Sequence, residues 1–226
     1  MNVVHRSDCS VTWGADEPGL LQCRSHALRT DDGRVWIIDP VDCSHLDDEL
    51  RAFGEPAGVI VLLDRHLRDA PAIAGRLGVP LHFPAGTQRQ TLPDGVHRFE
   101  GRIAECPFEF VSIRDSGRAW IERALWWPER EVLVVAEAVG TVPYFRTRPD
   151  DELGVHPMMH MRPPRPIASY EPRLLLVGHG DPLESPGKML ASTIARARRD
   201  TVRFASRTPK LLVAATRAAR SGRAGC

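Results

Sequence analysis

Acidic and histidine side chains follow three apolar runs of this sequence, and they are the groups that could carry chemistry. The run 58–63 (GVIVLL) leads into the charged segment 64–69 (DRHLRD), the run 131–136 precedes Glu137, and the run 174–177 precedes the triplet GHG around His179. Imidazole and carboxylate groups can bind a divalent cation or transfer a proton. The guanidinium groups of Arg65 and Arg68 can instead pair with these carboxylates. The pattern therefore allows a metal site or a metal-free ionic network.

Four of these residues can be weighed separately as site residues or as ordinary structural residues. Glu137 follows a buried strand, and a buried carboxylate needs a cationic partner, so we expect an arginine or a metal beside it. His179 lies between two glycines, which allow the backbone to come close to a site, and it is the best ligand candidate. Asp69 could simply cap the helix that begins at residue 70, and His66 could be a capping or ion-paired histidine.

The elements that position these residues are mostly strands at first and mixed later. Apolar alternation and turn residues predict a hairpin turn at 31–33 and helices over 46–52, over 70–77 and from 185 onward. Strands are predicted at 11–13, 21–28, 35–38, 58–63, 81–83, twice within 96–113, and at 119–126, 131–136 and 174–177. Strands with helices outside them indicate a layered α/β architecture. We expect one domain over 1–190 and a basic helical extension over 191–226 that packs on the domain or trails from it.

A proline-rich stretch, residues 141–172, separates the last two of these strands. It holds seven prolines, which predict a loop rather than a helix. We expect this loop to cover the site as a lid or substrate wall, with Tyr144, Arg146, His156 and His160 as substrate-binding residues. Alternatively, it is an ordered surface loop that packs through its methionines.

Four pieces of the sequence, in this order, resemble the metallo-β-lactamase superfamily. They are the segments 36–40 (WIIDP), 58–69, 124–138 (ALWWPEREVLVVAEA) and 174–180 (LLLVGHG), within a resemblance that spans roughly residues 10–190. The resemblance implies an α/β fold, the four-layer αββα sandwich with mixed sheets and outer helices. It also implies that segment 64–69 corresponds to the HxHxDH metal-binding loop, Glu137 to a metal-bridging aspartate and His179 to the last histidine ligand.

The departures from the family's pattern leave two registers open for segment 64–69. In one register only Asp69 survives from the motif; in the other, Asp64 and His66 take the first two ligand positions and the aspartate is lost. The third-strand histidine should fall near residues 114–117, where there is none. The metal site implied by the resemblance is therefore degenerate.

The resemblance implies a candidate ligand set of Asp64, His66, Asp69, Glu137 and His179, which Asp115 could join. Such a set could hold one divalent metal, Zn, Fe or Mn. The two arginines favour a metal-free network over a single bound metal. The implied function is a hydrolase-like protein that acts on a small ester, thioester or phosphoester, with Asp69 or the metal holding the attacking water. The alternative is a catalytically inactive member that serves as a ligand-binding or protein-interaction module.

Composition limits the remaining classes. The chain has 226 residues, 42% hydrophobic and 26% charged, without a run long enough to span a membrane. No CxxC pair, GxSxG elbow or phosphate-binding glycine loop occurs.

With no secretory signal, we expect a cytoplasmic protein, and 28 arginines against 2 lysines fit a bacterial coding bias. Residues 188–226 carry about +9, yet we do not expect nucleic acid as a partner, because aromatic residues for base stacking are lacking after Phe204. The expected partners are a small-molecule ligand or substrate and, if the protein forms a homodimer, a second copy of the chain.

Overall fold

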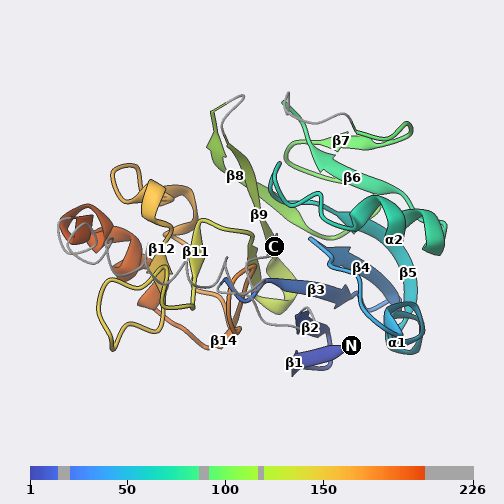
Figure 1. The fold of residues 1–226 in the computed structure, drawn as a ribbon, viewed down its shortest axis with the longest axis horizontal. Coiled ribbons are helices and arrows are strands. Elements are labelled where there is room, and N and C mark those ends of the chain that lie inside the picture. Colours follow the sequence, from blue (N-terminus) through green and yellow to red (C-terminus); the bar gives the residue numbers. More distant parts are fainter. Residues whose placement is uncertain (15–20, 87–91, 117–119, 202–226) are drawn as a thin grey trace, which may run out of the picture.

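A computed structural model describes residues 1–14, 21–86, 92–116 and 120–201 of the chain. Its first sheet has seven strands, whose order in space is their order in the sequence (Figure 1). These strands are β1 (Asn2–Arg6), β2 (Ser10–Gly14), β3 (Arg24–Arg29), β4 (Arg34–Ile38), β5 (Glu55–Ile60), β6 (Leu81–Pro84) and β7 (His97–Phe99). Neighbours are antiparallel from β1 to β4 and parallel from β4 to β7. The predicted hairpin joins β3 to β4, with Gly33 at φ +84.

The second sheet has five strands in the order β14-β13-β10-β9-β8. These are β8 (Glu109–Asp115), β9 (Ile121–Trp127), β10 (Val132–Val135), β13 (Leu174–Val177) and β14 (Leu183–Glu184). Strands β10 and β13 are parallel, whereas the other neighbours are antiparallel. A separate ribbon pairs β11 (Val139–Gly140) with β12 (Gly154–Val155). The fold is therefore built from mixed sheets, as the sequence predicts.

Two helices, α1 (Leu46–Phe53) and α2 (Ala70–Leu77), pack against one face of the first sheet. Side chains alternate across a strand, so Val35 and Ile37 of β4 pack in this helix layer while Trp36 and Ile38 face the second sheet. Helix α2 has the predicted bounds, with a proline in its first turn and a left-handed glycine after its last residue.

The larger core lies between the two sheets and continues beyond the second one. It joins residues of β4, β5, β9, β10 and β13 with Leu190, Ile194 and Ala197, which recur at helical spacing. These three belong to a helical segment that runs from 189 through 201. Short 3₁₀ turns η2 (Pro157–Met159) and η3 (Arg165–Ile167) add Met159 and Ile167 to the same cluster. The expected four-layer order of helix, sheet, sheet and helix is confirmed.

The helical segment 189–201 includes the first residues of the expected extension. Its buried residues pack into the core of the preceding domain, so residues 191–201 are part of that packing unit. Residues 202–226, which carry most of the basic extension, lie outside the described residues.

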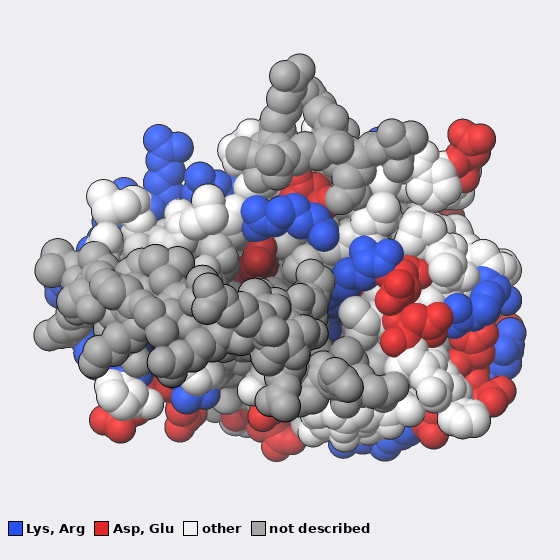
Figure 2. Space-filling view, in the orientation of Figure 1, with Lys and Arg blue, Asp and Glu red and all other residues white. Residues whose placement is uncertain are grey.

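Charged groups of both signs are interspersed on the surface over α1 and α2, on the right of Figure 2. Arg76 of α2 pairs with Asp42 at 2.6 Å and with Asp47 of α1 at 2.8 Å, which ties the two helices together. Within the described residues, the helices are all too short or too polar to cross a membrane.

Candidate functional site

The side chains of the candidate site follow the carboxyl ends of parallel strands. Asp39 follows β4, the segment 64–69 follows β5, Glu137 follows β10 and His179 follows β13. Because both parallel pairs end at the same edge of the sandwich, their loops converge there. One ligand atom from each of His66, Glu137 and His179 lies within 4.8 Å of the others. We call these three residues the HEH group.

The second half of the predicted strand 58–63 joins the two sheets. Strand β5 ends at Ile60, and the chain then crosses to β9 of the other sheet. The Arg123 amide donates to the Leu62 carbonyl at 2.9 Å, and the Asp64 amide donates to the Ile121 carbonyl at 3.0 Å. This crossing carries His66 from the end of one sheet toward the end of the other.

The glycines around His179 allow a close backbone approach, as the sequence suggested. A Cβ atom on Gly178 would lie 2.1 Å from the Ala136 carbonyl oxygen, which is shorter than any allowed contact. Gly180 has φ +97, and a Cβ there would lie 2.2 Å from Oγ1 of Thr141. Only glycine fits at both positions, and this brings His179 next to the turn that carries Glu137.

Hydrogen bonds fix the protons on the two histidines of the HEH group. Nδ1 of His179 donates to the Leu21 carbonyl at 3.2 Å, and a carbonyl can only accept. Nδ1 of His66 lies 3.2 Å from Oδ2 of Asp39, which accepts when it is ionised. Each neutral ring therefore turns an Nε2 lone pair toward the site. Burial, followed by neighbouring positive groups, lowers the pKa of both rings well below the usual range, so both are neutral.

His156 lies beside the HEH group with the opposite tautomer. Its Nδ1 accepts from the Met158 amide at 3.2 Å, so Nε2 carries the proton. That Nε2 lies 3.8 Å from Oε1 of Glu137, the same distance that separates Nε2 of His179 from this oxygen. Burial lowers the pKa of His156 to about 3. His156 is therefore a neutral N–H donor here rather than a metal ligand.

The cationic partner expected for Glu137 is Arg65. Its guanidinium group pairs with Oε2 of Glu137 and stacks on the Trp120 ring, 4.0 Å from the ring centroid. The second arginine, Arg68, bonds to the backbone instead. It donates to the carbonyls of Arg24 at 2.9 Å and Asp39 at 2.7 Å. The two arginines therefore differ: Arg65 forms an ion pair with the HEH group, and two bonds of Arg68 go to backbone carbonyls.

The sequence pattern gave Glu122 no role, although this residue holds the backbone and the tryptophan next to the HEH group. Its fully buried carboxylate accepts from the Glu137 amide at 2.8 Å, the Ala138 amide at 2.9 Å and Nε1 of Trp120 at 2.8 Å. Burial raises the pKa of Glu122 to about 7. The signal in the sequence was a single acid within an apolar strand, which required buried partners. Asp39 was noted only as part of the segment 36–40 that resembles the family, and it was given no role in the site.

The structure does not bring the other predicted ligands into the HEH group. Asp64 lies two residues before His66 and is buried, but it is outside the group. Asp69 is exposed, and its Oδ2 accepts from the Asp42 amide at 2.8 Å. Asp69 does precede α2, yet its side chain makes no capping bond there. Asp115 pairs with Arg123 at 3.1 Å. The HEH group contains His66 but neither Asp64 nor Asp69, so it matches neither of the two registers in full.

Some of the predicted substrate-binding residues lie at the HEH group and others do not. Tyr144 is half-buried, with its ring 5.9 Å from that of His156, and burial and the charge of Glu137 raise its pKa. His160 points elsewhere, because its buried Nε2 donates to the Val155 carbonyl at 3.1 Å. Arg146 is half-buried two residues beyond Tyr144. His156 and Tyr144 thus lie at the site, while His160 holds β12.

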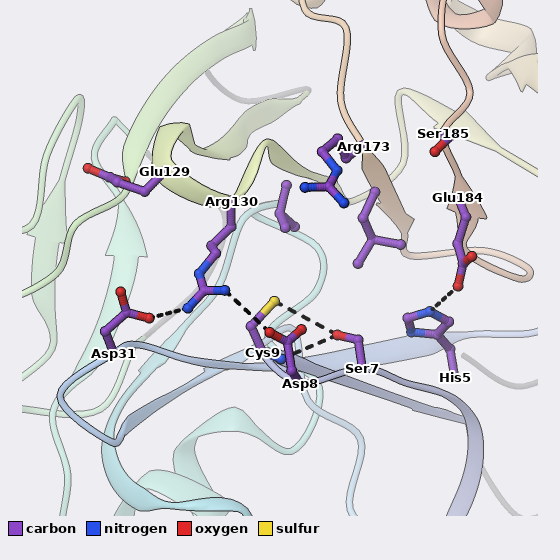
Figure 3. Close-up of a pocket in the computed structure, with 12 residues that line it drawn as sticks. His5, Ser7, Asp8, Cys9, Asp31, Glu129, Arg130, Arg173, Glu184 and Ser185 are labelled. Carbon is purple, nitrogen blue, oxygen red and sulfur yellow. Dashed lines mark hydrogen bonds and ion pairs between the residues drawn. The ribbon is translucent and has the colours of Figure 1, made fainter.

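A separate cavity of about 500 Å³ lies at the other ends of β10 and β13 (Figure 3). Its charged groups are largely paired with one another: Arg130 contacts Asp8 at 3.3 Å, and His5 contacts Glu184 at 3.2 Å. Burial raises the pKa of the Cys9 thiol, which opposes a thiolate nucleophile. The charges of this cavity therefore largely neutralise one another, and we base the candidate site on the HEH group.

Comparison with known proteins relates the chain to others by structure alone. No protein-family model and no curated protein matches the sequence. Among solved structures, the DIM-1 metallo-β-lactamase exposed to ceftazidime has a TM-score of 0.61 at 14% identity, over 87% of this chain and 97% of that one. A β-lactamase domain protein from Burkholderia ambifaria has a TM-score of 0.59 at 16% identity, over 87% and 72%.

A third match extends the similarity beyond proteins named for β-lactams. The putative diflavin flavoprotein A 5 from Nostoc sp. PCC 7120 has a TM-score of 0.55 at 13% identity, over 92% of this chain and 97% of that one. Together, these similarities show that the chain has the metallo-β-lactamase fold. Activity must still be argued from the site, because one fold supports many functions.

Proposed function

We propose that this chain is a hydrolase-like protein that holds one divalent cation at the HEH group and cleaves a small ester, thioester or phosphoester. The observation that carries the proposal is Nε2 of His179. This buried nitrogen has no hydrogen-bond partner within the described residues, while Nδ1 of the same ring is bound to the Leu21 carbonyl. A buried polar atom without a partner is costly, and a bound cation would satisfy it.

The donor set fits one cation. Two neutral imidazoles and one carboxylate suit Zn²⁺, Fe²⁺ or Mn²⁺. Within the described residues, the HEH group is the one cluster of three such ligands close enough to hold a metal. A single centre is therefore supported, in place of the pair of metals that the full motif of the family would provide.

When bound, the cation would lower the pKa of a water molecule and supply the nucleophile. The surrounding residues contribute in other ways. Asp39 holds the His66 ring, and Glu122 holds the backbone at Glu137 through two amides. His156 presents an Nε2–H group at the same carboxylate, where it can donate a hydrogen bond to the leaving group. Asp69 receives no role, because its carboxylate accepts from the Asp42 amide outside the group.

The ion pair between Arg65 and Glu137 supports the competing view, a catalytically inactive member. The Arg65 guanidinium group already neutralises Glu137, so the charges of the network balance without a metal. That network leaves Nε2 of His179 unsatisfied, however, and for this reason we prefer the metal-binding function.

Metal analysis of the purified protein tests the proposal. We expect about one equivalent of Zn²⁺, Fe²⁺ or Mn²⁺ per chain, and its loss in a His179→Ala variant. The matched control is His160→Gln, which alters a buried histidine outside the group and should keep the metal. The wild type should hydrolyse at least one member of a panel of esters, thioesters and phosphoesters. A metal-free, inactive wild type that takes up none of the three metals on titration would overturn the proposal.

A further inference from the structure

Arg65 is held differently from an ordinary ion-paired arginine. Its flat guanidinium group lies on the Trp120 ring, and 32% of its side chain remains exposed. Trp120 is itself fixed by donating Nε1–H to the buried Glu122. The guanidinium plane is therefore preorganised by an aromatic platform, while part of it can still be reached from solvent.

The two carboxylate oxygens of Glu137 have different surroundings. Its Oε2 pairs with Arg65, while its Oε1 lies 3.8 Å from Nε2 of both His156 and His179. A cation held by the HEH group would share a carboxylate whose charge Arg65 already neutralises in part. Two positive charges on one carboxylate repel each other, and burial strengthens that repulsion.

Arg65 can engage a different partner more readily than Arg68 can. The Arg68 guanidinium is committed to two backbone carbonyls, at 2.9 and 2.7 Å. The bond of Arg65 to Glu137 is a side-chain ion pair, so another anion can replace the carboxylate without any change of backbone. Arginine binds phosphoryl and carboxylate groups through two parallel N–H···O bonds.

We propose that Arg65 is the subsite for an anionic group of the substrate, a phosphoryl or carboxylate group, and that this anion and the cation at the HEH group bind cooperatively. The anion takes the Arg65 fork, Glu137 is released to the cation, and the repulsion between Arg65 and the cation is offset. The cooperative part rests on the proposed function; the anion subsite by itself does not.

The experiment compares Co²⁺ affinity, by equilibrium dialysis, with and without methylphosphonate. In the wild type we expect methylphosphonate to tighten Co²⁺ binding about tenfold or more, within the usual range of coupling between two sites. The variant Arg65→Gln should bind Co²⁺ more tightly than the wild type without the anion and should gain nothing when it is added. Arg102→Gln, which removes an exposed arginine paired with Glu109, is the matched control and should behave as the wild type does.

Two further arms define the anion. Acetate in place of methylphosphonate shows whether a carboxylate satisfies the subsite, and neutral N-methylacetamide should have no effect. Arg65→Lys keeps the charge without the flat fork and should retain only part of the gain. An equal gain in Arg65→Gln and the wild type would mean that the anion binds the metal directly, and this would overturn the proposal.

Calorimetry on the metal-free protein separates this inference from the proposed function. If Co²⁺ does not bind at all, the metal proposal fails, but methylphosphonate should still bind the wild type and Arg102→Gln. Loss of that binding in a folded Arg65→Gln variant, checked by circular dichroism, supports the subsite. Absence of binding to the wild type at millimolar methylphosphonate refutes it.

Discussion

Oδ2 of Asp39 lies 3.2 Å from Nδ1 of His66, while Oδ1 of the same carboxylate accepts from the Leu62 amide at 2.8 Å. Asp39 thus fixes the His66 ring and the crossing strand that delivers it. Burial raises the pKa of Asp39 to about 7, against the opposing effect of Arg68. The orienting carboxylate is therefore itself sensitive to pH near neutrality.

The variant Asp39→Asn tests this relationship. Asparagine can still accept from the Leu62 amide, but its NH₂ group then faces Nδ1 of His66 and favours the tautomer whose Nε2 carries the proton. Metal affinity should fall about 10- to 100-fold, the usual loss when such a partner is removed. Equilibrium dialysis with Co²⁺ measures the loss, and Asp42→Asn, on the exposed ion pair with Arg76, is the control. Unchanged affinity would show that Asp39 does not orient the ligand.

A pair of variants decides which residue of segment 64–69 is the ligand. His66→Ala should abolish stoichiometric metal binding, because it removes one of the three ligands of the HEH group. Asp69→Asn should leave metal content unchanged, since its carboxylate accepts from the Asp42 amide. Elemental analysis of both purified variants makes the comparison. Loss of metal in Asp69→Asn alone would favour the register in which Asp69 survives from the motif.

His156→Gln tests the assignment of this histidine as an N–H donor. Metal content should stay at the wild-type level, because Nδ1 is bound to the Met158 amide and Nε2 carries a proton. Turnover of whichever panel substrate the wild type cleaves should fall about 10²-fold or more, the range for loss of one hydrogen-bond donor to developing negative charge. Steady-state kinetics and metal analysis on the same preparation separate the two effects. Loss of metal would identify His156 as a ligand.

The pH dependence of stability tests the buried state of Glu122. Its folded pKa, about 7, lies above the ordinary value of 4.5, so the folded protein binds more protons than the unfolded chain between these values. The contribution of Glu122 to stability is therefore full below about pH 4.5 and is lost as pH rises toward 7. The destabilisation caused by Glu122→Gln should consequently be smaller at pH 8 than at pH 5.

Urea denaturation of wild type and Glu122→Gln at both pH values gives this difference directly. The buried histidines, whose lowered pKa values act in the opposite direction, are common to both proteins and cancel in the comparison. An equal penalty at pH 5 and pH 8 would show that Glu122 has an ordinary pKa.

Local pattern alone located most of the elements. The apolar run at 174–177, the glycine at residue 33 and the proline at the start of α2 each act through their immediate neighbours, so the sequence predicts them well. The run at 58–63 was predicted as one strand, but only residues through Ile60 belong to β5. The edge strands β1 and β14 were not predicted, because a short strand depends on its partner for its hydrogen bonds.

The sequence by itself determined that acidic and histidine groups follow buried strands, and that Glu137 requires a positive partner. Only the tertiary structure decided that the partner is Arg65 and that His66, rather than Asp69, joins Glu137 and His179. The physical reason is that strand order and crossing set which loop ends meet, and these depend on pairings between distant residues. The tautomers of His66, His156 and His179 were likewise decided by carbonyl, amide and carboxylate groups brought together only by folding.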